Sequence, residues 1–353
     1  MLICVYLEQV AHGKSFFTKI LILRSYLTGI EQYIIDPERE YQKICNKLNG
    51  TYIQIGANSK TYINIFDIRE ESQEDGNGYL ASKINKLVGF FKLIFGNIDE
   101  EEKAILEEKI IELYETKKIN FEDSSLYKKD EKTVNIKPVF KESKDMPTLG
   151  EFYEILGKDP KTKQMQIKLI PFVKGSLNFF NHQTNVILDN LLIVADVHDL
   201  GEENLAFGMY LFTEFFWDKI KANRRIKKAI YLDEAWRLIG VTSNKEVASF
   251  IYKIFKTIRK YGGSGVAITQ DISDIFSLDG GIYGKCLLNN SNIKMFFALE
   301  EENIKILEQN ITLTEKEKIE IKSLKRGEAL LFANQEHVLL KIDNANFEKE
   351  MIE

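Results

Sequence analysis

A fully apolar run that ends in two adjacent carboxylates limits the possible folds of this chain most. Residues 229–232 read Ala-Ile-Tyr-Leu, and Asp233 and Glu234 follow them directly. A run that is apolar at every position predicts a strand buried on both faces, as in parallel sheets covered by helices. Ligands of such sheets bind outside the carboxyl ends of the strands. The sequence therefore predicts an α/β fold with an acidic pair at its ligand-binding edge.

A second motif, a Gly-Lys-Ser tripeptide, is also expected at this ligand-binding edge of the sheet. Gly13-Lys14-Ser15 stands between the apolar residues 1–7, a predicted strand, and residues 14–27, a predicted helix. In a phosphate-binding loop the backbone N–H groups surround the phosphates, the lysine reaches the β and γ oxygens, and the hydroxyl binds Mg²⁺. We expect ATP and Mg²⁺ as ligands, with Gly13, Lys14, Ser15 and the adjacent Phe16 as nucleotide-binding residues. A tripeptide alone also occurs without function, and the acidic strand downstream argues against that alternative.

The loop departs from the full phosphate-binding pattern at one position. G-x-x-x-x-G-K-[ST] requires glycine at position 8, where this chain has Glu8. A carboxylate beside a polyphosphate costs roughly 2–4 kcal/mol at a few ångströms, which corresponds to about 30- to 1000-fold in affinity. We therefore expect a degenerate loop whose nucleotide binding is weak or absent.

Five further residues are candidates for metal binding or catalysis. Asp233 is expected to hold Mg²⁺ through water and Glu234 to polarise the attacking water, the alternative being an acidic helix start. Gln270 follows the apolar residues 266–269 and could sense the γ-phosphate, or be a solvated turn residue. Arg259 and Arg326 could act as arginine fingers on a neighbouring subunit's nucleotide, or be surface residues. Trp236 is predicted to be a packing residue.

Composition narrows the classes of function. The chain of 353 residues is 44% hydrophobic and 29% charged, with a formal charge of −5. These values indicate an ordinary globular protein and give no electrostatic case for a dedicated nucleic-acid binder. The basic run 224–228 predicts a solvated helix end, with contact to DNA or lipid as the alternative. No apolar run is long enough to span a membrane, and three scattered cysteines lack metal-ligand spacing, so we expect a cytoplasmic protein.

The order of predicted elements divides the chain into three segments: residues 1–77 begin the α/β core, 78–185 form an all-helical insertion, and 186–353 complete the core. Thr148 and Glu151 have the spacing of a capping box that starts a helix in the insertion. Strands are predicted at 1–7, 32–35, 51–55, 62–66, 190–195, 229–232, 265–269, 293–298 and 329–333, with 338–342 as an edge hairpin partner. Core helices are predicted at 14–27, 40–48, 204–222 and 245–261.

The order of the motifs resembles a known family. The chain reads Ser-Phe-Phe-Thr-Lys at 15–19, Ile-Asp-Pro-Glu-Arg-Glu-Tyr at 35–41, Asp-Val-His-Asp-Leu at 196–200, Asp-Glu-Ala-Trp at 233–236, Ile-Arg-Lys-Tyr-Gly-Gly at 258–263 and Lys-Arg-Gly-Glu at 325–328. This series is similar to the conjugative-transfer ATPases of type IV secretion systems, the VirB-four, TraE and TraC class, related to the HerA and FtsK pumps. The motif at 35–41 is the most specific element, because a generic nucleotidase has no reason to carry it.

The resemblance implies a RecA-like P-loop NTPase core interrupted by a helical subdomain. It also implies a motor that assembles with itself as a hexameric ring or dimer at the cytoplasmic face of the membrane. Inner-membrane components of a conjugation channel, a coupling protein and possibly DNA are the implied partners. The family carries an amino-terminal domain before the motor, so we expect a truncated gene product. Two alternatives stay open: an inactive RecA-like scaffold, favoured by Glu8, and a HerA- or FtsK-like DNA translocase, favoured by the basic run at 224–228.

Overall fold

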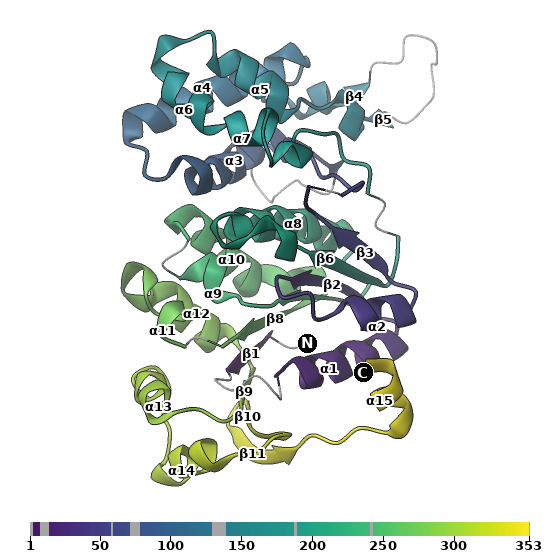
Figure 1. Ribbon diagram of the computed structural model, residues 1–353, viewed down its shortest axis with the longest axis vertical. Coiled ribbons are helices and arrows are strands. Elements are labelled where there is room, and N and C mark those ends of the chain that lie inside the picture. The colour runs from purple at the N-terminus through teal and green to yellow at the C-terminus, as the bar shows by residue number, and fades with distance from the viewer. Residues whose placement is uncertain are drawn as a thin grey trace. The chain divides into compact units, whose positions relative to one another are not determined.

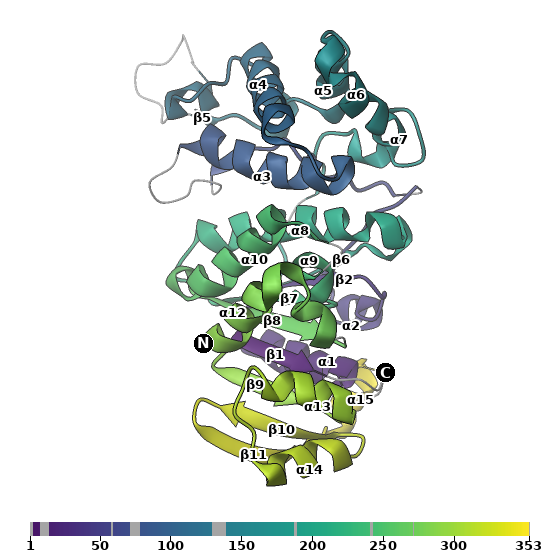
Figure 2. The same cartoon turned by 90° about the vertical axis from the view of Figure 1, so that its left-hand side faces the viewer.

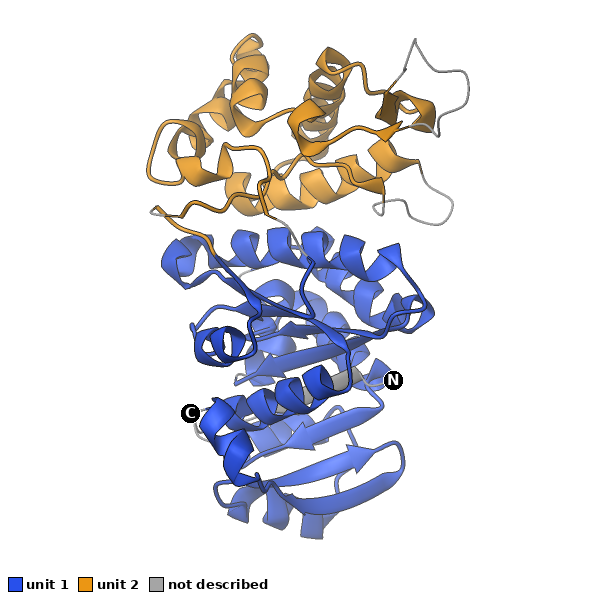
Figure 3. Ribbon diagram, turned by 90° about the vertical axis from the view of Figure 1, so that its right-hand side faces the viewer, with its two compact units in different colours: residues 1–53, 188–353 blue, residues 54–187 orange. Residues whose placement is uncertain are grey.

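The computed structural model describes residues 3–7, 14–57, 59–70, 78–128, 139–186, 189–240, 243–270 and 272–352. The chain forms two compact units (Figure 3). Unit 1 combines Met1–Ile53 with Leu188–Glu353, and unit 2 comprises Gln54–Ile187. Unit 1 contains both the acidic strand and the lysine of the predicted phosphate-binding loop, so the candidate site is built within one unit.

A sheet with the described strand order β11-β10-β9-β1-β8-β7-β2-β6-β3 forms the centre of unit 1 (Figure 1). The neighbouring strands from β9 through β6 pair in parallel, whereas β10 is antiparallel to both β9 and β11. The predicted edge hairpin is thereby confirmed. The bounds are β1 (Ile3–Leu7), β2 (Glu31–Asp36), β3 (Thr51–Gln54), β6 (Leu192–Asp196), β7 (Lys228–Leu232), β8 (Gly263–Thr269), β9 (Ile293–Phe296), β10 (Glu328–Ala333) and β11 (Glu336–Lys341).

Helices cover both faces of this sheet (Figures 1 and 2). On one face, the apolar side of α1 packs with that of α2 and α15 against Ile34, Tyr231 and Ile268. Alternate strand residues point to opposite faces, and Tyr33 accordingly contacts Phe216 of α8 at a ring distance of 5.2 Å. The helices of unit 1 are α1 (Lys14–Leu27), α2 (Gln42–Lys47), α8 (Glu202–Ala222), α9 (Trp236–Ile239), α10 (Lys245–Thr257), α11 (Ile272–Ile275), α12 (Ile282–Asn290), α13 (Glu301–Glu308), α14 (Glu315–Ser323) and α15 (Asn346–Ile352).

The strand register brings distant parts of the chain to one edge of the sheet. Ile35 lies opposite Leu232, and Leu232 lies opposite Ala267. Leu7 at the end of β1 lies opposite Thr269 at the end of β8. Because these strands are parallel, the residues that follow them emerge together at the carboxyl edge. Asp36, Asp233 and Gln270 are therefore neighbours by topology, although nearly 200 positions separate the first two.

Unit 2 is mainly helical and packs around an aromatic core. The Phe66 ring lies 5.6 Å from Phe152 and 6.1 Å from Phe91. Thr148 and Glu151 form the predicted capping box of α5. Its described elements are α3 (Tyr79–Phe95), α4 (Glu100–Thr116), β4 (Tyr127–Lys128), β5 (Val139–Phe140), α5 (Leu149–Leu156), α6 (Lys163–Lys168) and α7 (Ile170–Val173). The paired strands β4 and β5 add a short hairpin to the helices that the sequence predicts. No helix among the described residues is both long and apolar enough to cross a bilayer.

The two chain segments that lead into and out of unit 2 are joined to each other. The Tyr62 N–H donates to Asn185 Oδ1 at 2.8 Å, and the Asn185 N–H donates to the Tyr62 carbonyl at 3.2 Å. The Tyr62 ring stacks on His182 at 4.1 Å. We call Tyr62, His182 and Asn185 the neck of unit 2.

The neck also explains one wrong prediction. Residues 62–66 were expected to form a strand, but no strand forms there. The N–H groups of Tyr62 and Asn64 donate to the side chains of Asn185 and Thr184 instead of to a neighbouring strand. As a result residues 54–70 belong to unit 2, whereas the sequence analysis places residues up to 77 in the core.

Candidate nucleotide-binding site

The acidic pair directly follows β7, at the point where the chain leaves the sheet. β7 ends at Leu232, and the Asp233 N–H donates to the Ile35 carbonyl of β2 at 3.4 Å. Glu234 then adopts a φ of 48°, in the left-handed region that is uncommon for residues other than glycine. The Ala235 N–H donates to the Ile268 carbonyl of β8 at 2.9 Å, which closes this turn against the sheet. Both carboxylates are thus held in a turn whose backbone is fixed on two sides.

Lys14, the first residue of α1, makes an ion pair with both carboxylates. Its Nζ lies 3.2 Å from Asp233 Oδ1 and 2.9 Å from Glu234 Oε1. The three side chains are only 5%, 1% and 6% exposed in that order, so the pairing is screened little by water. Burial acts to lower the pKa of Lys14, but the two carboxylates outweigh it and raise that pKa above its ordinary value. The lysine therefore carries its charge, at the start of the helix where the sequence predicts a phosphate-binding lysine.

Glu234 receives two further hydrogen bonds. Gln270 Nε2 donates to Glu234 Oε1 at 2.8 Å, and Trp236 Nε1 donates to Glu234 Oε2 at 2.6 Å. The structure thus brings Lys14, Asp233, Glu234 and Gln270 together, as expected from the strand ends. Trp236 was predicted to be a packing residue, and its bond to Glu234 is a contact that the sequence analysis missed. An apolar-looking residue two positions after a carboxylate gives no signal of this bond.

Tyr41, the N-cap residue of α2, contacts one of the two carboxylates. The Tyr41 hydroxyl donates to Asp233 Oδ2 at 2.8 Å, and Tyr41 is fully buried. Asp36 at the end of β2 accepts the N–H groups of Glu40 and Tyr41, each at 2.9 Å. Burial raises the pKa of Asp36 to about 7, although these two N–H groups act to lower it. The specific motif at 35–41 therefore lies against the acidic pair, a position that its sequence spacing did not reveal.

The other predicted phosphate-binding residues are the immediate sequence neighbours of Lys14. Ser15 and Phe16 occupy the first turn of α1 and are partly buried, and Phe16 packs against the core of unit 1. Gly13 and Glu8 lie outside the described residues. Lys14, Ser15 and Asp233 supply an ammonium, a hydroxyl and a carboxylate, which is the donor set suited to a nucleotide and Mg²⁺. The described residues hold no cluster of three or more His, Cys, Asp or Glu side chains that could bind a metal without such a ligand.

The two candidate arginine fingers do not join the acidic pair within one chain. Arg259 precedes β8, at the amino edge of the sheet, where it donates to the Asn290 carbonyl at 2.8 Å. Arg326 is exposed in the turn before β10. Any action on a nucleotide would therefore have to be in a neighbouring subunit, which stays a prediction.

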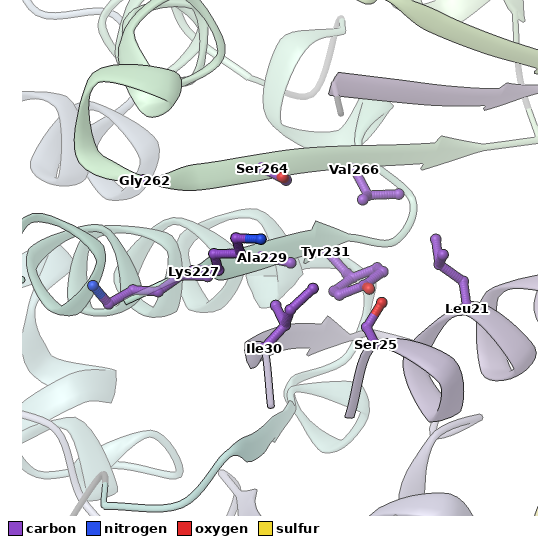
Figure 4. A pocket seen from close by; sticks show the side chains of 10 residues that line it. Leu21, Ser25, Ile30, Lys227, Ala229, Tyr231, Gly262, Ser264 and Val266 are labelled. Carbon is purple, nitrogen blue, oxygen red and sulfur yellow. The ribbon is translucent and has the colours of Figure 1, made fainter. Parts of the chain in front are cut away.

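A cavity of about 240 Å³ lies at the opposite edge of the sheet from the acidic pair (Figure 4). It is lined by the amino ends of β7 and β8 and by the last turns of α1, including Leu21, Ala229 and Val266. Because parallel strands separate the two edges, this cavity is distinct from the candidate nucleotide site.

Comparison with known proteins identifies the family. A model of the TraG P-loop domain matches residues 5–348. The chain belongs to the TraG P-loop domain family. The structure of VirB4 of Thermoanaerobacter pseudethanolicus is similar, with 30% identity, a TM-score of 0.86, and coverage of 99% of this chain and 91% of that chain. The predicted membership of the VirB4 and TraC class is thereby confirmed.

Two further likenesses are more distant. Protein TraC of Escherichia coli (strain K12) is 21% identical over 291 residues, which are 80% of this chain and 30% of TraC. The bacterial conjugative coupling protein TrwB is 12% identical, with a TM-score of 0.61 and coverage of 97% of this chain and 84% of that chain. TrwB has also been solved in complex with ADP and Mg²⁺, with a TM-score of 0.59. The TrwB likeness shows the fold alone, and it supports the predicted RecA-like P-loop NTPase core of this TraG-family chain.

Proposed function

We propose that this chain is the ATP-hydrolysing motor of a type IV secretion machine that transfers DNA by conjugation. One observation carries the proposal: a buried lysine at the start of α1 meets a carboxylate pair and a glutamine at the carboxyl edge of a parallel sheet. This is the edge at which open α/β folds bind their ligands. The likeness to VirB4 and TraC supports the choice of machine.

Each site residue has a role in this proposal. Lys14 exchanges its carboxylate partners for the β and γ phosphate oxygens, and Ser15 with Asp233 would hold Mg²⁺, which supplies charge neutralisation at the phosphates. Glu234, released by Lys14, polarises the attacking water. Gln270 already contacts Glu234, so it can relay the presence of the γ-phosphate to the end of β8. Arg259 and Arg326 would act across subunits in a ring or dimer.

We also propose a setting for the motor, on the resemblance to the ATPases of type IV secretion systems. We place it at the cytoplasmic face of the membrane, peripherally bound, with inner-membrane channel components and a coupling protein as partners. The chain spans 30% of the length of TraC, so the activity and partners of a whole TraC-like protein belong to the proposal. The expected truncation and degenerate loop also stay predictions.

Release of phosphate from ATP by the purified chain tests the proposal. Glu234→Gln keeps the size of the side chain but removes the charge that polarises water, so we expect a loss of about 100-fold or more. Glu203→Gln, an exposed residue at the start of α8, is the matched control and should leave the rate unchanged. Loss of activity in Glu234→Gln alone supports the motor.

The inactive-scaffold alternative is favoured by Glu8 and has its own outcome in the same assay. A silent parent chain that becomes active in Glu8→Gly shows an intact site disabled at its loop. If the parent and Glu8→Gly are both silent with ATP and Mg²⁺, the motor proposal is wrong. The DNA-translocase alternative has a weaker basis: residues 222–227 are exposed, but they lie at the amino edge, away from the acidic pair.

A further inference from the structure

The motif at 35–41 has no assigned part in nucleotide chemistry, yet the structure places it against the site. Ile35 pairs with Leu232, so Asp36 and Asp233 emerge side by side at the carboxyl edge. The chain then turns through Pro37 and Arg39, which has a φ of 57°, into α2. Two neighbouring strands therefore deliver two carboxyl groups to the same edge of the sheet.

Asp36 holds the turn that places Tyr41. Its Oδ1 accepts the Glu40 N–H and its Oδ2 accepts the Tyr41 N–H. Tyr41 is the N-cap of α2, whose N–H has no partner within the helix, and Glu40 directly precedes it. Asp36 is completely buried, so its carboxyl group has little freedom to turn away.

A second anchor fixes the middle of the motif. Arg39 Nε lies 2.7 Å from Asp196 Oδ2, and its other arm lies 2.7 Å from Asp199 Oδ1. Asp196 also accepts the Tyr52 hydroxyl at 2.7 Å. Charge-assisted bonds of this kind are about twice as strong as neutral ones. The motif is thus bonded to the end of β6 as well as to the end of β2. These contacts fix the backbone position of Tyr41.

The Tyr41 side chain, held by this backbone, orients the Asp233 carboxylate. Its hydroxyl donates to Asp233 Oδ2, whereas Oδ1 of the same carboxylate accepts the Glu234 N–H at 3.0 Å and faces Lys14. Both oxygens therefore have protein partners, and Oδ1 is the one that faces the lysine of the candidate site. Because Oδ2 is bonded to Tyr41, the carboxylate cannot rotate to bring Oδ2 toward Lys14 in place of Oδ1.

We propose that Tyr41 is a positioning residue that orients Asp233, so that a single carboxylate oxygen is presented to the magnesium ion of a bound nucleotide. The inference rests on the proposed function, because it assigns Asp233 to that metal. Partners of metal ligands typically change metal affinity by about 10- to 100-fold when they are removed. The motif at 35–41 is then a support for the metal-binding carboxylate.

Tyr41→Phe removes the hydroxyl and keeps the ring. The matched control is Tyr231→Phe, because Tyr231 is equally buried and its hydroxyl donates to Gln32 Oε1 at 2.9 Å, away from the site. Binding of a fluorescent ADP analogue is measured in a Mg²⁺ titration and again in EDTA, without hydrolysis, and thermal unfolding shows that each variant is folded. We expect Tyr41→Phe to need about tenfold more Mg²⁺ for half-maximal binding, with unchanged binding in EDTA.

The outcomes separate the two proposals. A parent chain that binds the nucleotide more tightly with Mg²⁺, together with a Tyr41→Phe variant whose Mg²⁺ requirement matches it, overturns the role of Tyr41 and leaves the motor standing. An equal shift in Tyr231→Phe also overturns it, since the effect would then belong to any buried hydroxyl. A parent chain that binds no nucleotide at up to millimolar concentration in either condition overturns the proposed function, and the role of Tyr41 with it.

Discussion

Replacement of Lys14 by methionine should destabilise unit 1 strongly, in addition to any effect on nucleotide binding. Methionine keeps the length and apolar stem of the side chain but leaves Asp233 and Glu234 as adjacent buried carboxylates without a cation. Breaking a buried ion pair by removing one partner costs about 3–5 kcal/mol. We expect a loss of this size in the free energy of unfolding.

Urea denaturation followed by tryptophan fluorescence measures this loss in the correct unit. The sequence contains two tryptophans, Trp217 and Trp236, and both belong to unit 1. Lys19→Met, on the same helix and partly exposed, is the control and should change the free energy of unfolding by less than about 0.5 kcal/mol.

A double variant tests the electrostatic origin of the effect. Adding Asp233→Asn to Lys14→Met removes one of the unpaired charges, so the double variant should be more stable than Lys14→Met alone. A Lys14→Met protein that loses less than about 1 kcal/mol would refute the reasoning, because the ion pair would then contribute no more than an exposed one.

Two further predictions concern titratable groups near the site. The pKa of Asp36 is raised to about 7 from an ordinary value of 3.8, so between pH 4 and 7 the folded chain retains a proton that the unfolded chain has released. The free energy of unfolding should therefore fall as pH rises through this interval, by about 4 kcal/mol at most from Asp36. Urea midpoints between pH 4 and 8 should fall more steeply in the parent than in Asp36→Asn, and equal slopes would contradict the prediction. Burial raises the pKa of the Cys45 thiol to about 12, so a variant with Cys4 and Cys286 replaced by serine should react with a disulfide reagent about 1000-fold more slowly when folded than in urea. Fast labelling of the folded variant would contradict this.

The parts of the fold that follow from local patterns were predicted well. The helix at 14–27 follows a predicted strand, the strand before Asp233 is a continuous apolar run, and Thr148 with Glu151 satisfies a cap within four residues. The meeting of Lys14 with Asp233 and Glu234 also followed, because parallel strands present their ends at one edge. Such inferences need only the direction of each strand.

The contacts that were missed join residues far apart in sequence through side chains. Tyr41 and Asp233 are separated by 192 positions, and only the pairing of β2 with β7 makes them neighbours. The false strand at 62–66 is mostly apolar, but the N–H groups of Tyr62 and Asn64 donate to side-chain acceptors more than 100 positions away. Periodicity predicts which face is apolar; it does not reveal which distant polar group satisfies a backbone donor.

The neck formed by Tyr62, His182 and Asn185 has a consequence for how this chain can change in evolution. Since the entering and leaving segments are bonded to each other, the chain between Tyr62 and Asn185 is a loop whose two ends are held together within unit 2. The entropic cost of closing a flexible loop grows by only about 0.6 kcal/mol for each doubling of its length. A longer chain between the two neck segments would therefore cost little free energy. Unit 2 can therefore gain or lose residues in evolution, while the residues of unit 1 that hold the acidic pair stay in place.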